Sequence, residues 1–344
     1  MFNNELSTFL GHWLPRVEEE MRDHLESAEE AVAQLYGMLR YHMGWADENL
    51  VPQKYAAGKR LRPMLCLLAT REIGGDTAQA LPAAAAIELL HNFSLIHDDI
   101  EDGDEMRRHR TTLWKVWGVP QAINAGDAMF AIAFAAMQRL ARRGVSPSDT
   151  LTALEIFTQT CLALTEGQHL DMSFEGRNDV SVDEYIRMIQ GKTAALLGAG
   201  VAIGSLLGGA SPIQQKAIQR FGVSSGLAFQ IQDDILGIWG DPTLTGKAAG
   251  NDLLRAKKSL PILYTMQHRQ VGVAFMTLLN GDFGPDQLPA ALEMMETAGA
   301  RDFAEERVHH YHQESSRALA AALGEQAAGS MLWALAEGLL NRQA

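Results

Sequence analysis

Residues 87–102 read IELLHNFSLIHDDIED. An apolar, helix-like run, 87–96, ends here in a cluster of carboxylates, Asp98-Asp99-Ile100-Glu101-Asp102. Like charges that share a site repel one another, so such a cluster is costly unless cations lie between the carboxylates. Asp98 and Asp102 lie one helical turn apart on the same face. This spacing suits Mg²⁺, which takes one or two carboxylates and keeps positions for substrate phosphates.

A second acidic pair, Asp233-Asp234, follows the apolar stretch 226–231 and precedes Ile235-Leu236. A run of acidic residues is most often a solvated surface, and that remains the alternative for each cluster taken alone. Because both clusters directly follow apolar runs, the pattern favours one shared metal site over two unrelated surfaces.

The composition limits the classes of partner. The chain has 344 residues, 47% of them hydrophobic, which is ample for a large core. Its formal net charge of -13 argues against nucleic acid or an anionic membrane as the main partner. An anionic substrate must therefore be met by local basic groups or by metal ions.

The number of cysteines and the lengths of the apolar stretches indicate the cell compartment. Cys66 and Cys161 are the only cysteines, too few for a disulfide framework or a cysteine zinc site. Residues 1–10 contain no recognisable signal peptide. The longest apolar stretch, 194–207, is short for a membrane span and contains three glycines. We expect a cytoplasmic protein without stable membrane insertion.

Nearly every segment has helical apolar periodicity. The predicted helices are 9–43, 64–73, 82–99, 125–143, 148–173, 182–207 and 212–236. The predicted breaks are 74–76, 144–147, 208–212 and 240–242. Ser181 and Glu184 have the spacing of a capping box. Alternating strand patterns are absent, so residues 1–344 predict a single large all-α domain with helices around a central cavity.

Basic groups follow or precede the acidic clusters. GKRLRP at 58–63 comes just before an apolar helix, where cations oppose the helix dipole unless an anion binds between them. Arg107 and Arg108 follow the first acidic cluster, and Lys247, Lys257 and Lys258 follow the second. Exposed basic loops and weak surface salt bridges are the alternative for each segment alone. The repeated order of acids and then bases favours a metal–diphosphate site.

Three polar positions interrupt apolar helices. His91 lies two turns before Asp98, on roughly the same face. Lys192-Thr193 follows Gly191 in an apolar stretch, and a buried lysine without a partner is costly. Gln230 lies three residues before Asp233. Each is either a satisfied core group or a group that faces a ligand.

The ordered motifs resemble those of the trans-isoprenyl diphosphate synthases, also called polyprenyl synthetases. The resemblance covers residues 50–260 and continues weakly to the C-terminus. The matching segments are GKRLRP at 58–63, HNFSLIHDD at 91–99, DDIED at 98–102, the arginine pair 107–108, GQHLD at 167–171, KT at 192–193, QIQDD at 230–234 and the stretch from Gly246-Lys247 to Pro261. Each motif alone is modest, but the ordered set is specific.

The resemblance implies an isoprenoid synthase fold and a homodimer. It implies a prenyltransferase that joins an allylic diphosphate to isopentenyl diphosphate head to tail (1′-4). The implied cofactor is Mg²⁺, three ions per active site, held by Asp98, Asp102 and Asp233. Neutralising the departing diphosphate lowers the barrier to breaking its C–O bond.

The resemblance also assigns the remaining roles. The implied allylic diphosphate contacts are Arg107, Lys192, Lys247 and Lys257. The implied isopentenyl diphosphate contacts are Lys59, Arg60, His91 and Arg108. Lys192, Thr193 and Gln230 are the implied catalytic residues, the last two as dipoles toward the cation.

The second motif departs from the family pattern. It reads Asp233-Asp234-Ile235-Leu236-Gly237, so glycine stands where the family has its last aspartate. Asp233 therefore lacks its helical partner, and its metal affinity is expected to fall. Asp241 is close in sequence but beyond the predicted helix end.

Product length is expected to depend on Phe93, five residues before Asp98, with the small Ser94 beside it. An aromatic residue here, with no insertion in the first motif, resembles enzymes that make geranylgeranyl diphosphate (C20). Farnesyl diphosphate (C15) is the next candidate, and an ordinary core phenylalanine is the alternative.

Two other functions share features with this reading. A class I terpene cyclase shares the fold and the first aspartate motif, but its N-D-x-x-S-x-x-x-E motif is not found. A cyclase also has no need for Lys59, Arg60 and His91. A non-catalytic subunit of a prenyl synthase fits the weakened second motif but not the intact first motif.

Overall fold

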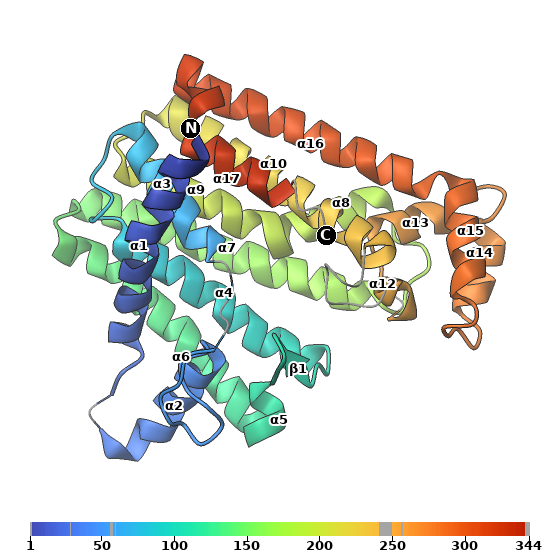
Figure 1. Cartoon of the computed structure of the whole chain (residues 1–344), viewed down its shortest axis with the longest axis horizontal. Helices are drawn as coiled ribbons and strands as arrows, with labels where there is room; N and C mark the ends of the chain where they lie inside the picture. Colours follow the sequence, from blue (N-terminus) through green and yellow to red (C-terminus); the bar gives the residue numbers. More distant parts are fainter. Residues whose placement is uncertain are drawn as a thin grey trace. The chain divides into compact units, whose positions relative to one another are not determined.

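The computed structural model describes residues 2–27, 29–55, 58, 60–240, 250–255 and 257–340. They form two compact units, 1–158 with 200–212 and 159–199 with 213–344, and each is described by itself. Among the described residues the strands are confined to a two-residue pair, β1 (Met106–Arg107) with β2 (Arg110–Thr111). The all-α prediction is confirmed (Figure 1), whereas the single domain stays a prediction.

The first unit contains the first acidic cluster. Its helical elements are α1 (Phe2–His24), η1 (Glu30–Val32), α2 (Ala33–His42), α3 (Leu61–Ile73), α4 (Leu81–Glu101), α5 (Leu113–Trp117), α6 (Val119–Gln138) and η2 (Arg139–Arg143). Residues of α7 (Pro147–Phe174) and α9 (Ala195–Leu207) occur in both units.

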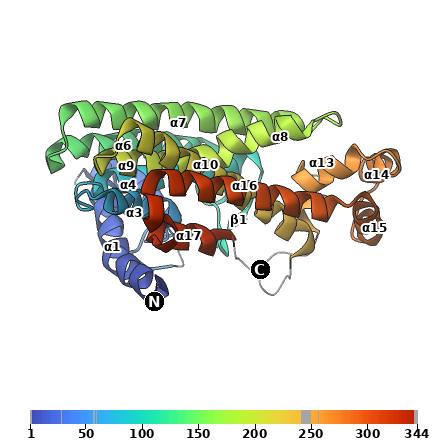
Figure 2. The same ribbon diagram turned by 90° about the horizontal axis from the view of Figure 1, so that it is seen from above.

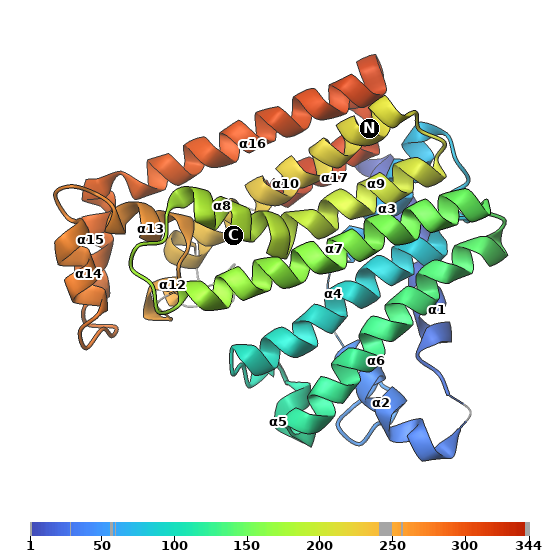
Figure 3. The ribbon, with the colours of Figure 1, turned by 180° about the vertical axis from the view of Figure 1, so that it is seen from behind.

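Helix α4 forms the centre of the first unit's core. Pro82 lies at its first turn, where the missing N–H of proline is harmless. The alanines 83–86 are fully buried, and these small side chains let neighbouring helices approach closely. Helices α4 and α6 lie side by side (Figures 1 and 3). Packing on all sides therefore holds rigid the helix whose last turn carries Asp98.

The second unit contains the second acidic motif. Its elements are α8 (Val182–Ile189), the π-helical segment η3 (Gln190–Ala194), α10 (Pro212–Trp239), α12 (Asn251–Leu254), α13 (Leu260–Met266), α14 (Gly272–Leu279), α15 (Leu288–Ala298), α16 (Ala300–Leu323), η4 (Gly324–Gly329) and α17 (Met331–Leu340). Figure 2 shows α13, α14 and α15 gathered at one end of α16. The capping box at Ser181 and Glu184 is confirmed.

Two of the predicted helices, 9–43 and 182–207, are interrupted. The first ends at His24 and resumes at Glu30, because the Ser27 hydroxyl accepts the backbone N–H of Glu29 at 3.1 Å and competes with the helix. The second contains the π-helical turn 190–194. Such turns widen a helix by one residue and often occur at functional sites.

Candidate active site

The three aspartates in the last turn of α4 differ in burial and in their partners. Asp98 is partly buried and Asp102, the C-cap residue, is exposed. Asp99 is buried, and the Arg107 guanidinium donates to it from Nε at 2.5 Å. Burial raises the pKa of Asp99 to about 6, although Arg107 opposes this rise. Asp98 and Asp102 are thus the pair that shares a face, while Asp99 positions Arg107.

The arginines after this turn lie on a tight hairpin. Arg108 and His109 connect β1 to β2 with φ of 52° and 62°, the left-handed region that favours glycine. Arg110 anchors the hairpin by donating to the carbonyls of Tyr41 and Ala46 at 2.7 and 2.8 Å. Non-glycine residues in this region are strained, and surrounding contacts such as those of Arg110 maintain the turn.

Two basic motifs that are distant in sequence meet in the first unit. A Cβ added at Gly58 would lie 2.8 Å from an Nη of Arg108, so GKRLRP approaches the hairpin closely. Arg62 Nη1 lies 3.2 Å from His91 Nε2. Arginine can only donate, so His91 accepts at Nε2 and carries its proton on Nδ1. Burial and the nearby arginines, Arg62 first, hold the pKa of His91 well below its ordinary value.

Arg60 has a different environment from Arg62. It is 3% exposed and donates to Glu18 at 2.9 Å and to Glu88 at 2.8 Å. Burial opposes its charge, but Glu88 and Glu18 outweigh that effect and raise the pKa of Arg60. Arg60, the predicted substrate contact, is therefore held in a buried ion pair, whereas Arg62, which the sequence analysis quoted in GKRLRP without a role, contacts His91.

The arginines border a small cavity of about 30 Å³, which His42, Asp99, Arg107 and Arg108 help to line. His42 Nε2 is buried without a hydrogen bond in the part of the chain that the structure describes. Burial and the neighbouring arginines lower the pKa of His42 to about 3, so it is neutral. An uncharged histidine leaves the positive field of the arginines available for an anion.

Phe93 begins a chain of aromatic contacts in the first unit. Its ring centroid lies 4.9 Å from that of Phe130, which lies 5.2 Å from Phe134. Phe134 in turn lies 5.0 Å from Phe157. Ser94 turns back along its helix, since its hydroxyl donates to the His91 carbonyl at 2.9 Å. The sequence reasoning found Phe93 but not the three rings beyond it, although Phe130 and Phe134 have the one-turn spacing of a shared helix face.

In the second unit, the π-helical turn positions Lys192. A Cβ at Gly191 would lie 2.5 Å from the Ala163 carbonyl, so only glycine lets this turn approach α7. Lys192 Nζ donates to Asp171 of α7 at 2.5 Å. Both side chains are about one quarter exposed, 24% and 23%, so the pair faces a partly open space.

A chain of hydrogen bonds orients the neighbouring polar groups. The Thr193 hydroxyl donates to Gln230 Oε1 at 2.9 Å, and Gln230 Nε2 donates to Asp234 at 3.2 Å. Asp234 also accepts from the Tyr185 hydroxyl and from the Leu260 N–H at 3.0 Å. Burial raises the pKa of Asp234 to about 6 against the effect of these donors and Lys257. Asp234 therefore fixes the amide of Gln230, and sequence reasoning missed Tyr185.

These polar groups surround a cavity of about 60 Å³, lined in part by Lys192, Gln230 and Lys257. Burial disfavours the charge of Lys257, but Asp234, Asp252, Asp171 and Asp233 raise its pKa. A lysine in such an acidic environment stays protonated and offers its charge to an anionic ligand.

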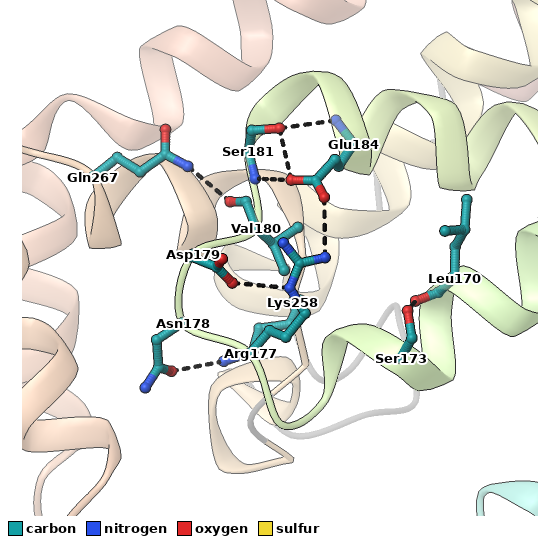
Figure 4. Close-up of polar contacts among 10 residues, drawn as sticks. All are labelled: Leu170, Ser173, Arg177, Asn178, Asp179, Val180, Ser181, Glu184, Lys258 and Gln267. Carbon is teal, nitrogen blue, oxygen red and sulfur yellow. Dashed lines mark hydrogen bonds and ion pairs between the residues drawn. The ribbon is translucent and has the colours of Figure 1, made fainter.

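A capped loop leads into the helix before the π-helical turn. Ser181 and Glu184 cap each other across the first turn of α8 (Figure 4). Arg177 donates to Asp179 at 2.8 Å and to Glu184 at 3.0 Å. These contacts fix the start of α8 and, through it, the register of Lys192.

Two predicted contacts, Lys59 and Lys247, lie outside the described residues, as does Asp241. Within the described residues, no three His, Cys, Asp or Glu side chains converge as a preformed metal site. No helix among them is long and apolar enough to cross a membrane.

A sequence model of the polyprenyl synthetase family matches residues 48–295. The chain is 40% identical over 273 residues to a (2E,6E)-farnesyl diphosphate synthase of Mycobacterium bovis, covering 78% of this chain and 75% of that protein. It is 41% identical over 268 residues to a geranylgeranyl diphosphate synthase of Mycobacterium tuberculosis, covering 78% and 73%. The crystal structure of a polyprenyl synthetase from Streptomyces coelicolor A3(2) matches with a TM-score of 0.89 and 34% identity, covering 97% and 99%.

Proposed function

We propose, on the premise that the chain belongs to the polyprenyl synthetase family, that it condenses an allylic diphosphate with isopentenyl diphosphate head to tail. It is an enzyme of the trans-prenyl diphosphate synthase class, and its relatives are synthases of C15 and C20 diphosphates. The relatives support neither a cyclase nor a non-catalytic subunit.

The observation that carries this proposal is the basic cluster of the first unit. Arg62 of GKRLRP contacts His91, and Arg108 approaches Gly58 of the same motif, so basic groups from three segments gather here. Two diphosphates need two sets of cations, whereas an enzyme that ionises one diphosphate needs a single set. We assign the basic cluster to isopentenyl diphosphate, with Arg62 in place of Arg60.

The donors of the acidic turn fit Mg²⁺. Asp98 and Asp102 offer only carboxylate oxygens from one face, and Asp99 is already held by Arg107. Mg²⁺ binds through few carboxylates and completes its coordination with water and substrate phosphates. When bound, it would neutralise the charge that develops on the leaving diphosphate. We propose Asp98, Asp102 and Asp233 as its ligands, with three ions per site.

The chain's own cations and dipoles serve the allylic substrate. Arg107, Lys192 and Lys257 would bind the diphosphate as the C–O bond breaks and its electron pair leaves with the diphosphate. The double bond of isopentenyl diphosphate then attacks the allylic cation, and a proton is lost to the departed diphosphate. Gln230 and Thr193, held by their mutual hydrogen bond, present dipoles toward this cation.

We propose C20 as the product and a cytoplasmic homodimer as the working form. The aromatic chain that starts at Phe93 is the feature that would limit product length.

Exposed apolar side chains on α6, Val119 at 40% and Ile123 at 44%, are suitable for burial against a second copy of the chain in a homodimer. Light scattering on the eluting protein measures the oligomeric state.

The experiment that tests the function is a pyrophosphate-release assay on the purified chain. We expect release only when both an allylic diphosphate and isopentenyl diphosphate are supplied with Mg²⁺. Release from the allylic substrate alone, with cyclic hydrocarbon formed, would favour a cyclase instead.

A further inference from the structure

Arg110 has a different environment from the two arginines that begin its motif. Its guanidinium carbon lies over two aromatic rings, 4.0 Å from the ring centroid of Tyr41 and 4.0 Å from that of Tyr55. The same guanidinium donates to the carbonyls of Tyr41 and Ala46 at 2.7 and 2.8 Å. These four contacts form the Arg110 clamp, which fastens the side chain to α2 and to the segment that follows it.

The Arg110 clamp holds the turn of the hairpin against α2. Arg110 opens β2, directly after the turn residues Arg108 and His109. On the other side of Arg110, the Thr111 carbonyl accepts the Tyr41 hydroxyl at 2.7 Å. Both residues of β2 are thus fastened to Tyr41, which is buried near the end of α2.

The Arg110 clamp also holds the segment that precedes GKRLRP. Tyr55 lies three residues before the first residue of that motif. The Tyr55 N–H donates to the Gly44 carbonyl at 2.9 Å and closes the loop between these residues, and Ala46 of the same loop accepts from Arg110. One arginine side chain therefore ties the turn of the hairpin to the segment that leads into the other basic motif.

Two forces act to separate these basic segments. Arg108 and His109 adopt the left-handed conformation, with φ of 52° and 62°, which is unfavourable for residues that have a Cβ. The Arg108 guanidinium also lies close to Gly58 of GKRLRP. Burial, and then the charge of Arg60, lower the pKa of Arg108, so its surroundings disfavour its positive charge. A movement of the turn away from GKRLRP would relieve both effects, and the Arg110 clamp opposes it.

We propose that Arg110 is a positioning residue for the isopentenyl diphosphate site. The Arg110 clamp keeps Arg108 beside GKRLRP before the diphosphate binds, so binding does not have to bring two mutually repelling segments together. This inference rests on the proposed function, because it takes the basic cluster as the site for isopentenyl diphosphate.

Steady-state kinetics of Arg110→Lys test the proposal. Lysine keeps the charge, but it lacks the planar fork that donates to two carbonyls and stacks on two rings. We expect KM for isopentenyl diphosphate to rise about tenfold, the factor that corresponds to one charge-assisted hydrogen bond, while KM for the allylic diphosphate stays within about twofold. Arg142→Lys, which changes an exposed arginine of η2 in the same unit, is the matched control and should keep both KM values.

A second variant distinguishes positioning from a simple loss of stability. Glycine adopts a positive φ without steric cost, so His109→Gly lets the turn form with less support from the Arg110 clamp. Added to Arg110→Lys, it should lower KM for isopentenyl diphosphate about fivefold, back toward the parent value. Loss of folded protein alone would reduce kcat and leave KM unchanged, and thermal unfolding checks that each variant is folded.

The outcomes separate the inference from the proposed function. A parent-like KM for isopentenyl diphosphate in Arg110→Lys overturns the role of Arg110 and leaves the proposed function standing. An equal rise in both KM values that His109→Gly does not reverse would make Arg110 a general structural residue and also overturns the inference. Absence of pyrophosphate release by the parent with both substrates overturns the proposed function and the inference together. A rise confined to isopentenyl diphosphate, with recovery in the double variant, supports the inference.

Discussion

Arg60 and Arg62 are two positions apart in GKRLRP but have different surroundings. The buried Arg60 neutralises Glu88 and Glu18, whereas Arg62 meets His91 at the basic cluster. Arg60 is the N-cap residue of α3 and has the αL conformation, with φ of 50°. Residue type alone does not distinguish two such neighbours, since burial decides between them.

This difference gives a paired prediction. Arg60→Met should lower the free energy of unfolding by about 3–5 kcal/mol, because it leaves a buried glutamate unpaired. Arg62→Lys should keep parent stability but raise KM for isopentenyl diphosphate about tenfold, because lysine lacks the forked donor. Denaturant unfolding and steady-state kinetics measure the two effects. If Arg60→Met instead raised KM and Arg62→Lys instead lowered stability, Arg60 would be the substrate contact.

Phe93 should control product length. Phe93→Ala removes the first ring of the aromatic chain and should shift the product beyond C20, while Phe93→Leu keeps most of the volume and should not. Chromatography of the prenyl alcohols released from each product measures the shift. An unchanged product in Phe93→Ala would mean that Phe93 is an ordinary core residue.

His42 should make stability depend on pH. Its folded pKa of about 3 lies below the ordinary 6.5, so between these values the unfolded state binds the proton first. The contribution of His42 is therefore complete only well above pH 6.5 and is lost as the pH falls. We expect a loss of about 1 kcal/mol between pH 6.5 and 5.5, because the unfolded histidine is already half protonated at pH 6.5.

Unfolding of His42→Gln at both pH values measures this contribution. The variant should lose less stability than the parent on acidification, and the exposed His12→Gln should behave like the parent. Equal pH dependence in parent and His42→Gln would show that His42 does not titrate between the two states.

At the scale of elements, the site depends on where helices are interrupted. The π-helical turn brings Lys192 to Asp171, and the hairpin of β1 and β2 brings Arg108 to Gly58. Helical periodicity predicted the helices around these points but not the interruptions. The interruptions arise from contacts between distant segments, such as Gly191 with Ala163, which a local pattern does not contain.

Gly191→Ala tests the π-helical turn. The added Cβ meets the Ala163 carbonyl, so we expect a loss of about 1–3 kcal/mol in stability and a lower kcat as Lys192 moves. Gly11→Ala on α1, which has nothing within 4 Å, should instead gain about 1 kcal/mol. Parent-like stability and kcat in Gly191→Ala would show that the close approach is unimportant.

At the scale of the whole molecule, the sequence predicted the all-α class and the order of the motifs well. Lys192 and Gln230, two of the residues that it singled out, lie in hydrogen-bonded polar clusters, and the roles predicted for them stay predictions. It did not single out Arg62 or Tyr185, because their contacts with His91 and Asp234 join segments that are distant in sequence. Gly237 indicated a departure in the second motif, and the structure adds that the Asp252 carboxyl group lies where a Cβ at this position would be.

An acidic chain, with net charge of -13, is expected to bind two diphosphates through local clusters of basic residues and metal ions. Arg62→Lys in one unit and Lys192→Ala in the other should therefore impair the same reaction. Neither cluster alone would explain a condensation.

The most direct test is the identity of the product formed by the purified chain. Incubation with isopentenyl diphosphate, an allylic primer and Mg²⁺, followed by mass spectrometry, should give an elongated linear diphosphate, with C20 as the main product. A cyclic hydrocarbon, or no consumption of isopentenyl diphosphate with any primer, would contradict the account.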